Sequence, residues 1–550
     1  MRFRNTRNAA TTAVSTAAVA VLSITLSGCG PDSGAQADPA GLPVSGGTLR
    51  LSIENEPECL DPHQSPTEAA RALTRPLVDS LVRQDDGGRI RPWLATSWTI
   101  STDQLVYDFK LREGVKFTDG APLDAAAVVA NLEHVVAPET KSLLASSLLS
   151  AFESAKAVDP STVEIRLKRP DSTLLISLAT PNLGIESPAT LKQDPAALCA
   201  KIVGSGPFSS PGGFVAQQGI DYVRNPDYKW SPEGAGHTGP AWLEAIKVQV
   251  APDKTARFGA LTSGQVDAIT SVSPTNAKEF GALPGFTLHA KPFPGINFSY
   301  WPNTASGPLA DVRVRKALRA GIDWDRIVKN VYFGVFEVAK GVISPTTPAF
   351  NTALQGEYAT DKDKANKLLD QAGWTARDGE GYRTKDGKRL KLRHMWSDAS
   401  ITDLATQIQA GAKELGIETV EENLDGGTYV ERLLSGDYDL LDTSFSASGP
   451  DVLRVLFAAE NIPTAERGIA NNISRYTGAQ SQDLLKRALS TVEQSEQFKL
   501  YGEVQKQITE DAAVFPVYSD RVTFGARSGV KQVQFDADGS PNFYEIWLTA

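Results

Sequence analysis

The side chains that most often carry catalysis are scattered in this sequence. Its five histidines have no H-E-x-x-H pattern and no pair four residues apart: His63, His134, His237, His289 and His394. No G-x-S-x-G turn, P-loop or helix-opening G-x-G-x-x-G occurs either. The three cysteines are far apart along the chain, unlike the ligands of a zinc finger. The sequence therefore predicts no enzyme, no cofactor and no metal site.

One cysteine stands where a thiol could react. Residues 1–28 join three early arginines to an uncharged run rich in Ala, Val, Leu, Thr and Ser, as in a secretory signal peptide. The run ends in LSGC, which resembles the bacterial lipobox: small residues at a cleavage point, then a thiol nucleophile. We expect cleavage before Cys29, a lipid on its sulfur and a flexible tether over residues 29–45. The alternative is an ordinary signal peptide with an incidental cysteine.

These features predict an exported protein, which a lipid anchors to the outer face of the cytoplasmic membrane. No other stretch approaches the roughly 18 consecutive apolar residues of a membrane-spanning helix. Without residues 1–28, the chain has 52 Lys and Arg against 65 Asp and Glu, a net charge of −13. An acidic chain without a basic cluster argues against nucleic acid or anionic lipid headgroups as partners.

Any ligand-binding side chains must be positioned by a mixed α/β framework. Alternation of apolar and polar residues predicts strands at 48–53, 106–111, 163–167 and 246–250. Capping residues predict helices at 125–136, 312–320, 362–372 and 401–415. Asp-Gly turns predict hairpins at 85–88 and 377–389. Strands and helices that alternate irregularly favour α/β lobes over a single barrel.

A series of short motifs resembles the family 5 extracellular solute-binding proteins, the group that binds oligopeptides, dipeptides or nickel. The most specific is FKLREGVKFTDG at residues 109–120, which is similar to the family signature FxLRxGVKFxDG. The others follow in the family's order: GGTLRL at 46–51, CLDP at 59–62, LVDSLV at 77–82, IRPWLATSW at 90–98, VGSGPF at 203–208, LTSGQVD at 261–267, DVRVRKAL at 311–318 and LLDQAGW at 368–374. The resemblance covers about residues 46–533.

The resemblance implies an α/β, bilobal periplasmic-binding-protein-like fold with discontinuous lobes and an extra inserted α/β domain. Lobe one would comprise residues 46–75, 204–291 and 515–550. The inserted domain would comprise residues 76–203, and lobe two residues 292–514. Such lobes close on a ligand by rotating toward each other about a hinge.

The resemblance also implies where a ligand would bind. Family members line the cleft with aromatic side chains, and Trp396 follows a strand whose loop would point into it. Tyr300 and Trp301 precede Asn303, which matches a family asparagine at the boundary between the lobes. For any one of these aromatic residues, a place in the core is the alternative.

The segment SFSASGPD at residues 444–451 departs from the family's peptide binders, which commonly read W-x-A-D-Y-x-D-P there. Phe445 takes the tryptophan position, Ser446 follows it, and Ser448 takes the position of the aspartate that pairs with a peptide α-amine. The usual amine clamp is therefore expected to be absent. Asp451 could replace it or could cap the following helix, and Arg454 could bind an anionic ligand or pair with Asp451.

Cys59 and Cys199 both fall near the expected join of lobe one and the inserted domain. A disulfide is chemically permitted outside the cell. A bridge between them and two buried thiols both remain open at this point.

The function that the resemblance implies is capture of a peptide or a related small polar solute for an ABC permease and its ATPase. A ligand sensor of the same fold is one alternative, and a secreted hydrolase is another.

Overall fold

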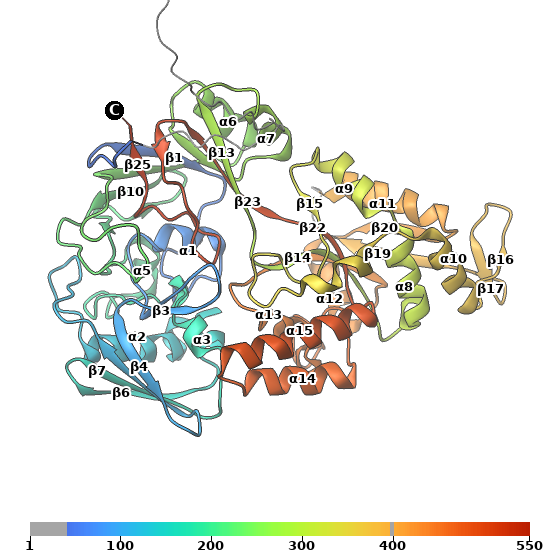
Figure 1. Cartoon of the computed structure of the whole chain (residues 1–550), viewed down its shortest axis with the longest axis horizontal. Coiled ribbons are helices and arrows are strands. Elements are labelled where there is room, and N and C mark those ends of the chain that lie inside the picture. The colour runs from blue at the N-terminus through green and yellow to red at the C-terminus, as the bar shows by residue number, and fades with distance from the viewer. Residues whose placement is uncertain (1–40, 143, 397–400, 550) are drawn as a thin grey trace, which may run out of the picture. The chain divides into compact units, whose positions relative to one another are not determined.

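Three larger sheets organise the residues that this computed structural model describes, 41–142, 144–396 and 401–549. All three lie within the compact unit Pro43–Ala550 (Figure 1). The predicted signal peptide and Cys29 lie outside the described residues, as do residues 397–400. No described helix is long and apolar enough to cross a membrane.

The first sheet is assembled from segments that are far apart in the sequence, coloured blue, green and red in Figure 1. Its strands in spatial order are β13 (Phe286–Pro292), β23 (Arg521–Arg527), β12 (Ala268–Thr270), β1 (Thr48–Ile53), β11 (Ala245–Val250), β10 (Gly219–Arg224) and β8 (Phe208–Ser209), with β9 (Phe214–Val215) paired to β10. β1 runs parallel to both of its neighbours, β11 and β12. The carboxyl ends of β1 and β12 therefore meet at one edge, where ligands of open α/β sheets commonly bind.

The third sheet belongs to the segment between β1 and β8. It is antiparallel, in the order β4 (Ala95–Ile100), β5 (Val106–Leu111), β7 (Thr162–Leu167) and β6 (Phe152–Asp159). A hairpin of β2 (Val82–Gln84) and β3 (Ile90–Pro92) precedes it. The helices before β12 are α1 (Glu68–Thr74), α2 (Ala125–Val136), α3 (Leu144–Leu148), α4 (Leu174–Ser177), α5 (Pro195–Ala200) and α6 (Lys254–Thr262), and α7 (Pro274–Phe280) follows β12.

The second sheet holds the strands between β13 and β23. Their order is β15 (Glu337–Val338), β22 (Phe515–Ser519), β14 (Gly295–Pro302), β21 (Leu440–Ser446), β19 (Lys391–Trp396) and β20 (Glu418–Asn423). Its helices are α8 (Val312–Gly321), α9 (Trp324–Tyr332), α10 (Lys362–Gln371), α11 (Thr402–Glu414), α12 (Gly426–Ser435), α13 (Val452–Phe457), α14 (Ala479–Leu489) and α15 (Gln494–Glu510). Two small sheets complete the fold, one of β16 (Ala376–Arg377), β17 (Arg383–Lys385) and β18 (Lys388–Arg389) and one of β24 (Val530–Lys531) and β25 (Trp547–Leu548).

The chain passes between the first and second sheets by direct strand connections. β13 continues into β14, and β22 continues into β23. Because β22 pairs with β14 and β15, the predicted start of the last lobe-one segment at residue 515 is too early by one strand. The change of sheet comes at Asp520, between β22 and β23.

The predicted elements and caps are present. The side chain of Asp124 accepts a hydrogen bond from Ala127 N at the start of α2, and Asp311 does the same for Arg313 N at the start of α8. Gly373 and Gly416 follow α10 and α11 with φ of 90° and 81°, the left-handed conformation that glycine adopts without strain. These local signals were sufficient because each needs only neighbouring residues.

The VGSGPF motif lets two segments pack backbone to backbone. A Cβ on Gly204 would lie 2.2 Å from Leu77 O, and one on Gly206 would lie 2.5 Å from Pro76 O. Without these Cβ atoms, Gly206 N donates to Leu77 O. The glycines therefore join the end of the inserted segment to its beginning.

A disulfide joins Cys59 to Cys199, which are 140 residues apart in the sequence. Leu60 N, next to the first cysteine, donates a hydrogen bond to Cys199 O. Of the two alternatives that the sequence leaves open, the structure therefore has the bridge and not two free thiols.

Candidate functional site

A cavity of about 440 Å³ lies where β1 and β12 end. From the first sheet and its helices it is lined by residues of β1, α1, β12 and the start of α7. Phe293, before β14, and Phe336, before β15, also line it. Phe336 packs on the hydrophobic core of the second sheet. The cavity is therefore bounded by side chains from both halves of the expected cleft, and its volume is typical of a small-molecule site.

The cavity carries charges of both signs. Its acidic lining residues are Glu54, Glu68, Asp520 and Asp538, and its basic ones are Arg71, Lys254 and Arg521. Five of these seven have an oppositely charged partner: Glu54 lies 3.2 Å from Arg257 Nη2, Arg521 lies 3.3 Å from Glu337, and Arg71 lies 4.0 Å from Glu68 and 3.9 Å from Asp538.

Asp520 is the carboxylate in this lining that lacks a cationic partner among the described residues. Its Oδ1 accepts the backbone N–H of Arg521 at 2.8 Å. No ion pair to it occurs within residues 41–142, 144–396 and 401–549. Loss of solvent around the group raises the pKa of the Asp520 carboxyl. A ligand cation beside it would lower that pKa again and be held by the charge.

Arg71 connects the cavity to the segment at residues 444–451. Its Nη2 donates to Ser446 Oγ at 3.4 Å, and its Nε lies 3.9 Å from Asp538 Oδ2. Only 11% of its side chain is exposed. The guanidinium therefore lies between α1 and the end of β21, at a place where a ligand carboxylate could bind it.

Ser448 lies on a second, smaller cavity beside the first. Its carbonyl accepts a hydrogen bond from Gln84 Nε2 at 2.9 Å. Arg75, whose guanidinium lies 5.0 Å from the centre of the Trp93 ring, lines this cavity together with Asp536. The two cavities share residues Asp538, Pro541 and Phe543 in their walls. The structure thus brings both serines to the cavities: Ser448 lines the smaller one, and Ser446 contacts Arg71, which lines the larger one.

Asp451 has a structural partner instead of a free carboxylate. It stands before α13, but its side chain makes no capping hydrogen bond. Arg454 Nε and Nη2 donate to its two oxygens at 2.9 and 2.6 Å, and Tyr501 Oη donates at 2.7 Å. Asp451 is therefore not a side-chain cap of this helix, and the pairing of Arg454 with Asp451 is confirmed.

The aromatic candidates on the second sheet are buried in its two cores. Trp301 is fully buried, packs on Phe457 and donates from Nε1 to Thr443 O. Tyr300 points to the opposite core because successive strand residues face opposite sides. Both faces of β14 are covered, so the prediction that Trp301 lines the cleft is wrong: it is a core residue.

Trp396 and Phe445 lie away from the lining of both cavities. Trp396 ends β19, is 8% exposed, and its Nε1 has no hydrogen-bond partner among the described residues. Phe445 is half-buried against the core on one face of the second sheet. Their role in ligand binding stays a prediction.

A buried ionic cluster lies next to Tyr300 on the second sheet. His394 Nδ1 is 2.5 Å from Glu421 Oε2, and His394 Nε2 is 3.1 Å from Asp442 Oδ1. Burial opposes a charge on this imidazole, but the hydrogen bonds to Asp442 and Glu421 outweigh it and raise the pKa of His394. The centre of this ring lies 4.6 Å from that of the Tyr300 ring, with the two planes tilted by 39°. The cluster ties three strands together.

Sequence reasoning missed Asp520 and Arg71. Neither lies in a motif with a recognisable ligand-binding pattern. Asp520 sits at the change of sheet, and Arg71 reaches the cavity only because α1 packs beside the end of β21. The sequence does contain one signal, the acidic residue between the strands at 515–519 and 521–527. Only the tertiary fold shows that this residue lines a cavity.

The model of the bacterial extracellular solute-binding proteins, family 5 Middle, matches residues 89–459. The chain belongs to this family. Its relatives are binding proteins and not enzymes. It is 27% identical over 474 residues to the glutathione-binding protein GsiB of Escherichia coli O1:K1 / APEC, which covers 84% of this chain and 87% of that protein.

Two solved structures of this family superpose on most of the chain. NikA from Brucella suis, in complex with Fe(III)-EDTA, gives a TM-score of 0.79 at 25% identity and covers 92% of this chain and 100% of its own. DppA from Helicobacter pylori, in complex with the peptide STSA, gives a TM-score of 0.73 at 26% identity. The superposition covers 92% of this chain and 99% of the DppA chain. The family 5 chain thus has the periplasmic-binding-protein-like α/β fold that the motifs implied.

Proposed function

We propose that this family 5 protein is a lipid-anchored receptor outside the cytoplasmic membrane that captures a peptide or a similar small zwitterion. It delivers the solute to an ABC permease and its ATPase. The observation that carries the proposal is the unpaired Asp520 carboxylate, which lines the same 440 Å³ cavity as the Arg71 guanidinium. Opposite charges on one cavity complement a molecule with an ammonium and a carboxylate group.

The structure offers a replacement for the absent amine clamp. Ser448 cannot neutralise an ammonium group, and Asp451 is already neutralised by Arg454. A desolvated ammonium needs a carboxylate partner, and Asp520 is available for it. A ligand carboxylate would bind Arg71, which already contacts Ser446.

Lobe closure would couple binding to delivery. A ligand shifts an open–closed equilibrium only if it binds one state better. A zwitterion that contacts Asp520 and Arg71, together with Phe293 and Phe336, touches segments of both sheets and so favours the closed state. The changed outer surface would then be recognised by the permease.

Two relatives support the substrate class. GsiB is named for glutathione, itself a small peptide with free charged ends, and DppA was solved with the peptide STSA. NikA, solved with Fe(III)-EDTA, shows that the same fold also holds an anionic metal chelate. The unpaired carboxylate of Asp520 disfavours such an anion here.

Native mass spectrometry of the protein purified from its own host, without refolding, tests the proposal. We expect co-purified peptides or another small molecule that contains an amine and a carboxylate, released at low pH and restored by a free-termini peptide library. A bound haem, a metal chelate or a solute without an amine would contradict it. If the protein is empty, a thermal-shift screen follows, in which failure of every peptide and amino acid counts against the proposal.

A further inference from the structure

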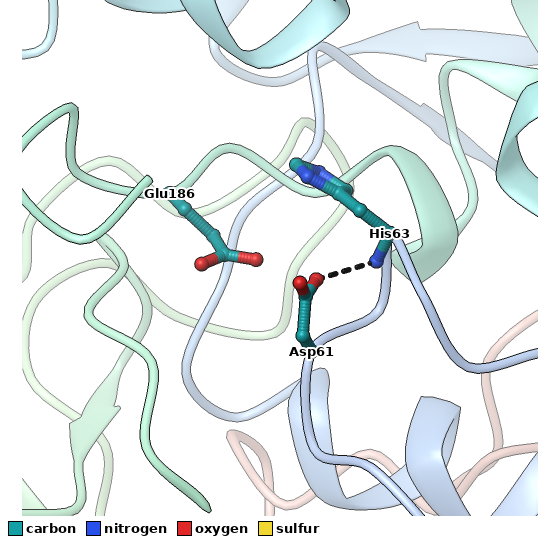
Figure 2. Close-up of side chains that lie close together, drawn as sticks. All are labelled: Asp61, His63 and Glu186. Atoms are coloured by element: carbon teal, nitrogen blue, oxygen red, sulfur yellow. Dashed lines mark hydrogen bonds between the residues drawn. The ribbon is translucent and has the colours of Figure 1, made fainter. Parts of the chain in front are cut away.

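A buried cluster of potential metal ligands lies outside the two cavities. Asp61 and His63 come from the turn that precedes α1, and Glu186 comes from the segment before α5 (Figure 2). Their exposed fractions are 0%, 1% and 0%. One ligand atom from each lies within 4.8 Å of the others. None of the three lines the cavity that holds Asp520.

One of the two carboxylates in this cluster, that of Glu186, has no hydrogen-bond partner among the described residues. Asp61 accepts hydrogen bonds from His63 N and Gln64 Nε2, both at 2.7 Å. Both oxygens of the Glu186 carboxylate are buried and have no hydrogen-bond partner among the described residues. Figure 2 shows the Glu186 carboxylate turned towards that of Asp61.

No positive charge compensates these acids. Among the ion pairs of the described residues, no Lys or Arg approaches Asp61 or Glu186. Burying two ionised carboxylates without a cation carries a desolvation cost comparable to the whole stability of a domain. Either a proton or a metal ion must neutralise the pair.

The tautomer of His63 is the one that a metal-binding imidazole needs. His63 Nε2 lies 3.0 Å from the carbonyl oxygen of Gly184, so this nitrogen carries the proton and donates it. The other nitrogen, Nδ1, is then unprotonated and accepts a hydrogen bond from His134 Nδ1 at 3.0 Å, so a metal ion at His63 Nδ1 would take the place of that hydrogen bond. A metal-binding imidazole typically donates its second N–H to a carbonyl in this way, which fixes the ring and leaves the ligand nitrogen unprotonated.

We propose that Asp61, His63 and Glu186 bind a divalent first-row transition ion, Zn²⁺ or Mn²⁺. One imidazole with two carboxylates suits these ions. Ca²⁺ and Mg²⁺ prefer a full set of oxygen ligands. Two carboxylates and a dication give a neutral site.

The ion is a structural part of the protein and not its transported solute. The site is buried and belongs to the same join as the disulfide, since Asp61 is two residues from Cys59 and Leu60 N donates to Cys199 O. It links the turn before α1 to the segment at residues 184–187, as the disulfide links that turn to α5. The inference stands apart from the proposed ligand, because Asp520 is not part of it.

Elemental analysis of the purified full-length protein is the first test. We expect about one Zn²⁺ or Mn²⁺ per chain, kept after dialysis against EDTA in the folded state and released on unfolding. Protein that refolds with added Zn²⁺ or Mn²⁺ should have a higher melting temperature than protein that refolds with EDTA. Wild-type protein without metal after both purification and refolding in excess Zn²⁺ and Mn²⁺ would overturn the proposal and leave a shared proton.

Glu186→Gln separates the ion from the proton. Under the proposal this variant loses the metal and the effect of added Zn²⁺ on its melting temperature, while Glu503→Gln, an exposed change on α15, keeps both. If a proton bridges the acids instead, Glu186→Gln melts at or above the wild-type temperature at neutral pH and no variant binds metal. Asp520→Asn should keep the ion, which distinguishes this site from the solute cavity. If Glu186→Gln does not fold, the metal content of the wild type decides.

Discussion

Single side chains decide what this cavity can bind, and Asp520 is the clearest case. An acid in contact with little water and no cation is held in an unfavourable state, which a ligand ammonium relieves. Its neighbour Asp538 does not offer the same site, because Ser540 and Arg71 already satisfy it. The chemistry of the pocket therefore depends on which acid is left without a partner.

Asp520→Asn should weaken binding of an amine-bearing ligand by about 2 kcal/mol or more, roughly 30-fold in Kd, because it removes the charge that pairs with the ammonium. Isothermal titration calorimetry measures this directly. Asp227→Asn, an exposed change outside the cavity, is the matched control and should leave Kd unchanged. Equal affinity of wild type and Asp520→Asn would show that the amine binds elsewhere.

Arg454 and Asp451 should matter for stability and not for binding. Arg454→Met leaves the Asp451 carboxylate with Tyr501 alone, at a position where its side chain is 15% exposed. We expect a loss of about 1.5–3 kcal/mol in the free energy of unfolding. Urea unfolding measures the loss, and calorimetry should give the wild-type Kd. A large loss of affinity with normal stability would restore Asp451 or Arg454 as a ligand-binding residue.

At the scale of elements, the strands of the second sheet hold the buried charges of His394, Glu421 and Asp442. The sequence predicts a strand at residues 390–394, but not that its histidine lies between carboxylates of β20 and β21. Sheet neighbours come from pairing between distant segments, which periodicity does not report.

Stability should depend on pH through His394. Its folded-state pKa lies above the unfolded value of about 6.5, so its stabilising effect is complete below that pH and is lost as the pH rises through the folded pKa. The difference in unfolding free energy between wild type and His394→Gln should therefore shrink from acidic to alkaline pH. His289 is the control, since burial lowers its pKa and His289→Gln should show the opposite trend. A difference for His394→Gln that does not change with pH would mean that the ring is neutral throughout.

How much of the fold the sequence predicts depends on how local each signal is. The caps at Asp124 and Asp311 and the glycines after α10 and α11 were found because they involve neighbouring residues. The boundary at residue 515 was misplaced because β22 reads as an ordinary apolar strand, and only its pairing with β14 shows which sheet it joins. Trp301 was misplaced for the same reason. Alternation shows that a strand has two faces, but not that both faces of β14 are covered by cores.

At the scale of the whole molecule, the proposed function requires the receptor to stay near its permease. The described residues include no helix that could span a membrane. The proposed attachment is a lipid on Cys29, and the expected tether of residues 29–45 could extend to at most about 60 Å at ~3.5 Å per residue. In the proposed function, solute capture and membrane attachment belong to separate parts of the chain, so each can be changed alone.

Cys29→Ala should release the protein from the membrane without changing its affinity for solute. Without the thiol there is no site for the lipid, so we expect the protein to leave the membrane fraction or to remain as an uncleaved precursor of higher mass. Immunoblots of membrane and soluble fractions with intact-mass analysis measure both. Ser33→Ala in the tether should remain lipidated and membrane-bound. Wild-type protein whose Cys29 carries no lipid would contradict the anchoring proposal.

The central claim is that the ammonium group of a zwitterionic solute pairs with Asp520. Titration of wild type and Asp520→Asn with a bound peptide and with its N-acetylated form tests it most directly. We predict that acetylation and Asp520→Asn each weaken binding by about 2 kcal/mol or more, and that the two losses do not add, because both remove the same charge pair. If acetylation costs the same in both proteins, the amine does not meet Asp520 and the account of this cavity is contradicted.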